Sequence, residues 1–222
     1  MSRQLPLDLT HAASFDLADF MVSSINRQAF DMIAGWPDWP AHAVALVGPA
    51  GCGKTHLGAA WATISDAVRA EPDMAPESVA AGAPVLIEDA DRVGFDDTLL
   101  FHLFNWTRET GGRILFTART APTRWPVTLP DLKSRLATVP VMAIEAPDDD
   151  LLRMIVTKLF SDRQLQVDPA VIDYMMMRMD RSFDGARQLV AAMDARSLAG
   201  KREITKHLAR ECLDEPTVAK ES

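Results

Sequence analysis

The stretch that decides the fold is Gly48-Pro-Ala-Gly-Cys-Gly-Lys-Thr55, which has the spacing GxxxxGK[ST]. It follows the apolar run 43–47 and opens a helix-forming run that begins at Lys54. Glycines at these positions let successive backbone N–H groups turn toward phosphate oxygens, and the start of a helix adds a partial positive charge. The strand–loop–helix context therefore predicts a P-loop within an α/β nucleotide-binding fold.

The chemistry of a P-loop assigns a role to each residue type in this stretch. Lys54 is expected to reach the β- and γ-phosphates of ADP or ATP, and Thr55 is expected to bind Mg²⁺. The other positions assigned to the nucleotide site are Gly48, Pro49, Ala50, Gly51, Cys52, Gly53 and His56. An ordinary glycine-rich turn is the alternative interpretation, and the flanking strand and helix argue against it.

A second apolar run, residues 85–87, ends in the two acids Glu88 and Asp89. An acidic strand end beside a P-loop is typical of a Walker B segment, in which one acid holds Mg²⁺ and the next orients the attacking water. The usual order begins with Asp, whereas here the longer Glu88 takes the metal position and Asp89 the catalytic one. Because of this Glu–Asp order, the sequence leaves open whether the chain hydrolyses its own ATP. An acidic strand end that faces solvent is the alternative.

The chain divides by pattern into three segments. Residues 1–13 read as an extended arm, residues 14–147 as an αβα nucleotide-binding base, and residues 148–222 as a helical lid with no strand. Strands are predicted at 43–48, 85–89, 113–120 and 141–147, and helices at 20–33, 54–70, 96–111 and 130–138. Residues 71–84, with three prolines, are expected to be irregular.

Composition limits the classes of function. The 222 residues carry a net charge of −8, and both halves of the chain are acidic, so a general nucleic-acid binder is a poor fit. The two cysteines show no metal spacing and indicate a reducing compartment. We expect neither a signal peptide nor a membrane span, and therefore a soluble cytoplasmic protein without a membrane partner.

Taken together, these segments resemble the AAA+ ATPases of the bacterial initiator DnaA family over nearly the whole chain. SFDLADFMVSSINRQAF (14–30) is similar to the family's leading motif, which implies that Asn26 and Arg27 lie near the adenine. GPAGCGKTHL (48–57) is similar to its Walker A segment. ILFTARTAP (114–122) takes the place of the sensor 1 strand, so Thr117 would contact the γ-phosphate or the attacking water. Arg119 stands where an initiator usually has Asp.

Two arginines acquire roles from the same resemblance. DLKSRL (131–136) is close to the family's arginine-finger motif, which implies that Arg135 is offered across an interface to a neighbour's nucleotide. RSFDGA (181–186) is similar to the sensor 2 motif, which implies that Arg181 lies over the bound phosphates. By spacing alone, either arginine would more simply be a solvated surface residue.

The chain also departs from the initiators. The interval from Lys54 to Glu88 is shorter than in typical initiators, so the second strand and the helix before Walker B are expected to be reduced or lost. The initiators' C-terminal helix-turn-helix domain is expected to be absent. In the arm, Gln4, Leu5, Leu7 and Leu9 resemble the QLxLxL-type peptide with which bacterial proteins dock on the replication sliding clamp. An ordinary N-terminal strand is the alternative for the arm.

The resemblance implies a negative regulator of chromosomal replication initiation. Such a protein would bind the DNA-loaded sliding clamp, the β subunit of DNA polymerase III, and meet DNA only indirectly through it. It would stimulate hydrolysis of DnaA-bound ATP with Arg135 in trans while having at most weak ATPase activity of its own. The alternatives are an autonomous AAA+ ATPase that loads a helicase or transposase, and a nucleotide-locked adaptor without a catalytic contribution. Homo-oligomer formation is left open.

Overall fold

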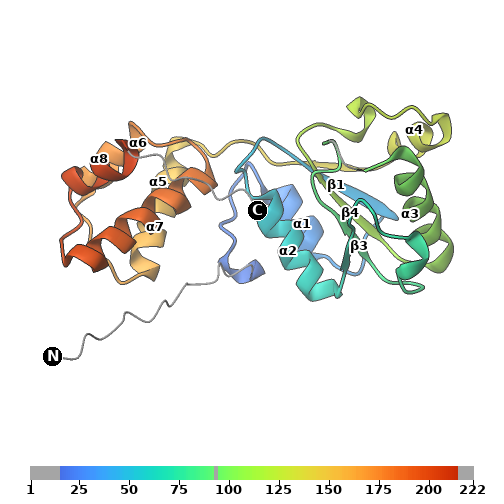
Figure 1. Ribbon diagram of the computed structural model, residues 1–222, viewed down its shortest axis with the longest axis horizontal. Coiled ribbons are helices and arrows are strands. Elements are labelled where there is room, and N and C mark those ends of the chain that lie inside the picture. The colour runs from blue at the N-terminus through green and yellow to red at the C-terminus, as the bar shows by residue number, and fades with distance from the viewer. Residues whose placement is uncertain (1–15, 93–94, 215–222) are drawn as a thin grey trace.

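The computed structural model describes residues 16–92 and 95–214, which form a base built on a parallel sheet and a helical lid (Figure 1). The strands are β1 (Ala43–Val47), β2 (Val68–Arg69), β3 (Val85–Ile87), β4 (Ile114–Ala118) and β5 (Val141–Ala143). The helices of the base are α1 (Arg27–Ala34), α2 (Lys54–Ser65), α3 (Asp97–Thr110) and α4 (Pro130–Leu136). Those of the lid are α5 (Asp149–Asp162), α6 (Pro169–Met176), α7 (Phe183–Gly200) and α8 (Lys206–Asp214).

The sheet has the strand order β2-β3-β4-β1-β5, and every pairing is parallel. Its central strands β1, β3 and β4 are buried along nearly their whole length, as expected for strands covered on both faces. The carboxyl ends of parallel strands share one edge, so the P-loop after β1, the acids after β3 and the end of β4 meet there. The predicted α/β fold class is confirmed.

Alternate residues of the strands build two separate cores. Leu46, Leu86 and Leu115 face α1 and α2, where they pack with Leu57 and Trp61. The opposite face carries Ile87 and Phe116, which pack with Leu103 of α3 and Leu132 of α4. Figure 1 shows the consequence: α1 and α2 lie on the side of the sheet toward the lid, and α3 and α4 lie on the other side.

Two predicted helices have different limits in the structure. The helix expected from residue 20 begins only at Arg27, because the Asn26 side chain fixes the preceding turn instead. The helix expected to reach residue 70 ends at Ser65, because Asp66 adopts a left-handed conformation with φ 55°. The chain then pairs Val68–Arg69 with β3. The second strand is thus reduced to two residues, as the short interval before Glu88 predicts.

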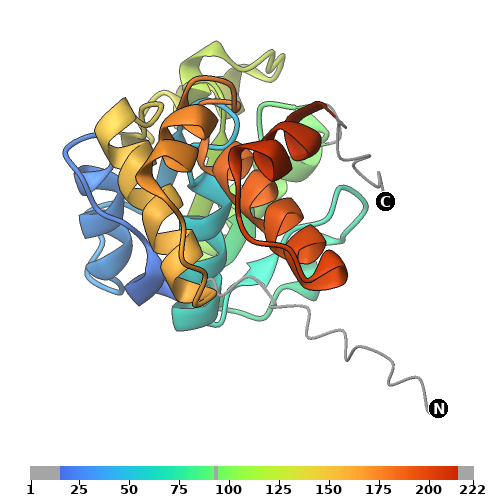
Figure 2. The same cartoon turned by 90° about the vertical axis from the view of Figure 1, so that its left-hand side faces the viewer.

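The lid helices begin at side-chain caps that the sequence encodes. Asp148, Asp168 and Ser182 each precede a helix, and each side chain accepts a hydrogen bond from a backbone N–H of its first turn. Behind them, Phe160, Met175 and Met193 are almost wholly buried in a lid core of their own. Figure 2, which looks from the lid toward the base, shows α5 and α7 side by side.

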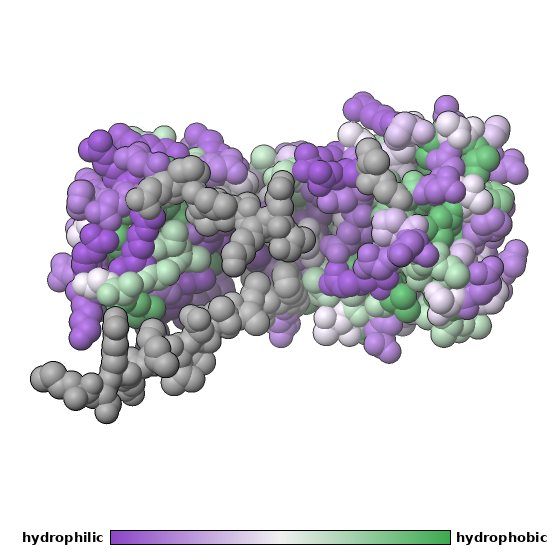
Figure 3. Space-filling model, viewed as in Figure 1, coloured by the Kyte–Doolittle hydropathy of each residue, from purple (hydrophilic) through white to green (hydrophobic). Residues whose placement is uncertain are grey.

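The outer surface agrees with this burial. The face seen in Figure 3 is mostly hydrophilic, and hydrophobic residues form small separate patches between hydrophilic ones. Within the described part of the chain, none of the helices combines the length and apolar character that crossing a bilayer requires.

Asp97, the first residue of α3, fixes the approach to α4. Its Oδ2 accepts hydrogen bonds from the Thr128 hydroxyl at 2.6 Å, from the Thr128 N–H at 2.6 Å and from the Leu129 N–H at 3.2 Å. These bonds, led by the Thr128 hydroxyl, hold the pKa of Asp97 below its ordinary value of 3.8. Leu129 directly precedes α4, so one carboxylate holds that helix against α3.

Asp97→Asn is therefore expected to lower the free energy of unfolding by about 1 kcal/mol at neutral pH. A carboxylate with a depressed pKa contributes stability above its unfolded pKa and loses it as the pH falls through the folded pKa. The difference between wild type and variant should thus be full at neutral pH and shrink below about pH 4. Urea unfolding across this range measures it, and a difference that does not change with pH would contradict the assignment.

Candidate nucleotide-binding site

The P-loop is held in shape by contacts that exclude side chains. The Gly48 N–H donates to the Ala118 carbonyl at 3.2 Å, which ties the loop to the end of β4. A Cβ on Gly48 would lie 2.2 Å from the Ile144 carbonyl oxygen, so no larger residue fits without backbone movement. Gly51 and Gly53 have φ values of +70° and +102°, in the left-handed region that favours glycine. The glycine pattern is thus used by the backbone as a phosphate-binding loop requires.

Lys54 lies inside this loop and is only 6% exposed. Its Nζ donates to the carbonyls of Gly48 at 2.8 Å and Pro49 at 2.7 Å, and it lies 3.8 Å from Cys52 Sγ. Burial raises the pKa of the Cys52 thiol, although the nearby Lys54 charge acts in the opposite direction. The Lys54 ammonium has three N–H donors. On nucleotide binding, phosphate oxygens would take the place of the Gly48 and Pro49 carbonyls as acceptors.

The two acids predicted for Walker B differ in their surroundings. Glu88 is partly buried: its Oε2 accepts from Arg69 at 2.5 Å, and its Oε1 is buried without a hydrogen-bond partner. Burial raises the pKa of Glu88, which the Arg69 charge opposes and the Asp89 charge reinforces. Asp89 is exposed, has a φ of +47° and lies 3.4 Å from the Arg92 guanidinium.

Thr117 of β4 is hydrogen-bonded to the segment that follows β3. Its hydroxyl accepts from the Asp89 N–H at 3.0 Å, and its carbonyl accepts from the Ala90 N–H at 2.9 Å. The side chain is 2% exposed and packs on α2, where a Cβ on Gly58 would lie 3.3 Å from its methyl group. The polar residue predicted for sensor 1 is therefore hydrogen-bonded to the backbone of the predicted catalytic acid, not to its carboxylate.

These side chains suit a magnesium–nucleotide complex. Among the described residues, no group of three or more His, Cys, Asp or Glu side chains is placed to hold a metal alone. A divalent cation would accordingly need phosphate oxygens as ligands, as Mg²⁺ does in nucleotide sites. Thr55 at the start of α2 and the unpartnered Oε1 of Glu88 are oxygen donors of the type that Mg²⁺ prefers. They would hold the cation beside the β- and γ-phosphates.

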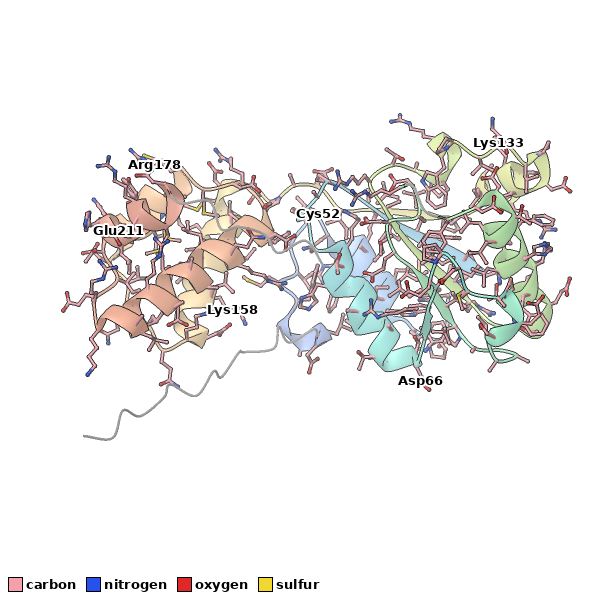
Figure 4. All side chains as sticks on the ribbon, viewed as in Figure 1. Cys52, Asp66, Lys133, Lys158, Arg178 and Glu211 are labelled. Carbon is pink, nitrogen blue, oxygen red and sulfur yellow. The ribbon has the colours of Figure 1, made fainter. Side chains whose placement is uncertain are left out.

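The lid closes directly on the P-loop. The Phe183 N–H donates to the Gly51 carbonyl at 3.0 Å, and a Cβ on Gly51 would lie 2.8 Å from Ser182 Cβ. Figure 4 shows Cys52, the next residue of the loop, where the base meets the lid. Arg181, predicted to lie over the phosphates, precedes this contact and forms an ion pair with Asp149 at the start of α5. Phosphates would compete with that carboxylate for the guanidinium.

His56 links the lid, the P-loop helix and the N-terminal segment. Arg187 of α7 lies 2.9 Å from its Nδ1, and the Asp16 carbonyl lies 3.1 Å from its Nε2. A guanidinium only donates, so Nδ1 accepts and Nε2 carries the proton that is donated to Asp16. The Phe20 ring packs against the imidazole with centroids 5.4 Å apart. Arg187 lies just beyond the segment that resembles sensor 2, and Phe20 lies within the segment that resembles the leading motif, but neither resemblance predicts a contact with His56. The tertiary structure brings both side chains here.

The structure shows separate contacts for Asn26 and Arg27. The buried Asn26 side chain accepts from the Ser23 N–H at 2.8 Å and donates to the Met21 carbonyl at 2.9 Å. Arg27 is exposed, with its guanidinium 3.8 Å from Asp31. The arm residues Gln4, Leu5, Leu7 and Leu9 lie outside the described residues.

Arg135 lies on α4, and its guanidinium stacks over the rings of Phe101 at 5.2 Å and Phe104 at 5.9 Å. Arg108 and Arg113 belong to the same positive region as Arg135, since the charges of all three lower the pKa of His42. Burial, and then these three charges, lower the pKa of His42 to about 4. Within residues 16–92 and 95–214, none of the three arginines forms an ion pair.

The fold and the loop together define the class of the protein: it has the AAA+ fold, with a P-loop base and a helical lid. Domain III of the replication initiator DnaA from Thermotoga maritima has this fold, with 18% identity, a TM-score of 0.73 and coverage of 90% of this chain and 95% of that one. DnaA from Aquifex aeolicus, solved with AMPPCP, gives 18% identity and a TM-score of 0.68, with coverage of 84% and 67%. A RuvB variant from Thermotoga maritima is 16% identical with a TM-score of 0.66, and the match covers 90% of this chain and 72% of that one.

The particular resemblance by sequence is again to an initiator. The chain is 31% identical over 114 residues to the chromosomal replication initiator protein DnaA of Bacteroides thetaiotaomicron. The match covers 50% of this chain, which spans only 23% of the length of that relative. No protein-family model matches the chain.

Lys54→Ala tests the phosphate site directly. Loss of a charge-assisted contact worth about 1.5–3 kcal/mol should weaken ADP and ATP binding at least tenfold, measured by titration calorimetry. Lys133→Ala, which removes an exposed lysine on α4 far from Cys52 in Figure 4, is the matched control and should bind as wild type does. Unchanged nucleotide affinity in a folded Lys54→Ala protein would refute the P-loop assignment.

Proposed function

We propose that the chain is a nucleotide-binding regulator of replication initiation, a counterpart of Hda, the short DnaA-related protein that inactivates the initiator. The DnaA-like AAA+ fold and the partial sequence match to an initiator support the link to replication. The proposal has three parts: a nucleotide held at the P-loop, an arginine that acts on a partner, and an arm that docks on the sliding clamp.

The first part concerns ADP or ATP bound with Mg²⁺. Its phosphates would accept from the P-loop N–H groups, Lys54 and Arg181, and its adenine would lie near Asn26 and Arg27. The direct contact between Gly51 and the lid supports a structural role for the nucleotide, because a ligand bound there would set the angle between base and lid. Asp89 and Thr117 would orient a water, and weak intrinsic hydrolysis is all that this role requires.

The second part assigns Arg135 to a partner's nucleotide, and one observation carries it. Figure 4 places α4, marked by Lys133, at the end of the base far from Cys52 of the P-loop. Arg135 is therefore remote from its own phosphate site, and it stands in a group of three arginines without carboxylate partners in the described structure. Uncompensated cations at a surface attract an anion from another molecule.

The chemistry of such a contact is charge stabilisation. Hydrolysis of ATP on DnaA spreads negative charge over the transferred phosphoryl group, and an arginine supplied in trans stabilises that charge. Phe101 and Phe104 would hold the guanidinium in place, which lowers the entropy cost of presenting it. The third part, docking of Gln4, Leu5, Leu7 and Leu9 on the clamp, would bring the finger to its partner.

Arg135→Ala should abolish stimulation of hydrolysis on ATP-bound DnaA, by about 10³-fold at the chemical step, in single-turnover assays with clamp on DNA. Arg135→Lys should rescue poorly, because a point charge does not reproduce the planar guanidinium fork. Nucleotide and clamp binding should persist, and loss of the stacked guanidinium should lower the free energy of unfolding by only about 0.5–1 kcal/mol.

Lys133→Ala on the same helix is the control for this assay and should stimulate normally. A folded Arg135→Ala protein that still stimulates hydrolysis would show that another arginine is the finger. The same assay separates the rivals: an autonomous loader would hydrolyse its own ATP without DnaA, and an adaptor without a finger would leave turnover on DnaA unchanged.

The arm should be separable from nucleotide binding. Replacement of Gln4 and Leu5 by Ala should abolish retention on immobilised clamp, because the side chains that would fill its pocket are removed. The melting temperature and ADP affinity should not change. Asp8→Ala, at a position that the pattern leaves free, is the matched control. Wild-type clamp affinity in the double variant would mean that the pattern arose by coincidence.

A further inference from the structure

Each of the two Walker B acids has an arginine partner from its own chain. The Arg69 guanidinium lies 2.5 Å from Glu88 Oε2, and that of Arg92 lies 3.4 Å from Asp89 Oδ2. The Arg69 contact is the tighter one and the less exposed one, with 47% of the Arg69 side chain and 34% of the Glu88 side chain accessible. The position proposed for a cation ligand is therefore already in contact with a positive charge.

The sheet register brings Arg69 to this place. Arg69 pairs with Leu86 across β2 and β3, and the Ala70 N–H donates to the Leu86 carbonyl at 2.8 Å. Registered residues of parallel strands point to the same face, so Arg69 lies on the face of Leu86 that packs against α2. Glu88 directly follows the end of β3, where the Arg69 guanidinium reaches its carboxylate. The last residue of the two-residue strand β2 is therefore the arginine that forms the ion pair with Glu88.

The consequence is an unequal use of the two carboxylate oxygens. Arg69 takes Oε2, whereas Oε1 is buried and has no hydrogen-bond partner. The carboxylate can still offer one oxygen to a cation, but the adjacent guanidinium repels that cation and cancels part of the attraction. A positive charge a few ångströms from a binding site weakens cation affinity even when water screens it in part.

We propose that Arg69 is a positioning residue that holds Glu88 and weakens the grip of the chain's own nucleotide site on Mg²⁺. This inference rests on the proposed nucleotide site and deepens it. The nucleotide is kept by phosphate contacts at the P-loop, and the cation that hydrolysis requires is held weakly. The longer Glu88 in place of the usual Asp suits this arrangement, because one oxygen of its carboxylate contacts the arginine and the other would be left for a cation.

The experiment measures cation binding rather than turnover. Mn²⁺, a paramagnetic substitute for Mg²⁺, is titrated into the full chain saturated with ADP, and free Mn²⁺ is followed by electron paramagnetic resonance. Arg69→Ala should bind Mn²⁺ about threefold to tenfold more tightly than wild type, because the competing charge is gone. ADP affinity in EDTA should stay the same, since Arg69 lies on the edge strand and does not contact the P-loop in the described structure.

Two controls identify the cause. Arg69→Lys keeps the charge and should resemble wild type, whereas Arg69→Gln should resemble Arg69→Ala and replaces it if the alanine variant does not fold. Arg153→Ala removes a comparable arginine in the lid, 2.6 Å from Asp173 and 46% exposed, and should leave Mn²⁺ affinity unchanged.

The outcomes separate this inference from the proposal on which it rests. Unchanged or weaker Mn²⁺ binding in folded Arg69→Ala and Arg69→Gln, with normal ADP binding, overturns the role of Arg69 and leaves the nucleotide site standing. A wild-type chain that binds no ADP in EDTA overturns the nucleotide site and this inference together.

Discussion

The structure depends on the close approach of the lid to Gly51. The Gly51 carbonyl accepts from the Phe183 N–H, and the space beside its Cα is filled by Ser182. The same loop ends β1 and begins α2, so a single contact connects the sheet, the helix that bears Lys54 and the first turn of α7. Any ligand that reshapes this loop must also shift the lid, since a packed interface does not deform continuously.

Local physical rules account for the parts of the fold that the sequence predicts. Buried parallel strands read as short apolar runs, and the P-loop requires glycine where φ is positive, so both are visible in the sequence. The lid contacts are different. His56 and Arg187 are 131 positions apart. No periodicity or spacing in the sequence links this imidazole to a guanidinium at the fifth residue of a distant helix. The sequence does not predict the early end of α2, because a left-handed conformation at an Asp such as Asp66 follows no recognisable pattern.

The arginines show most clearly what a sequence leaves undecided. Spacing alone treats Arg135 and Arg181 as equal surface cations, and Arg69 lies in no motif, yet the environments of the three arginines differ in kind. Arg69 pairs with Glu88, Arg135 stacks on two aromatic rings, and Arg181 pairs with Asp149 of the lid. The charge of an arginine is fixed, so its effect is decided by the group that tertiary structure places beside it. Such partners come from other elements, which is why a one-dimensional pattern identifies the residue and not its role.

These environments also allow the two proposed nucleotide functions to stay independent. At the carboxyl edge of the sheet, Lys54 and the lid meet at the P-loop, and Arg69 sits on the acid that would hold the cation. At the distant end of the base, Arg135 is braced by α3, and Asp97 holds the approach to α4. A finger that is rigid within its own subunit needs no turnover at its own P-loop to remain in place. The chain could therefore retain its own nucleotide and also act on a partner's nucleotide, because a separate set of contacts serves each task.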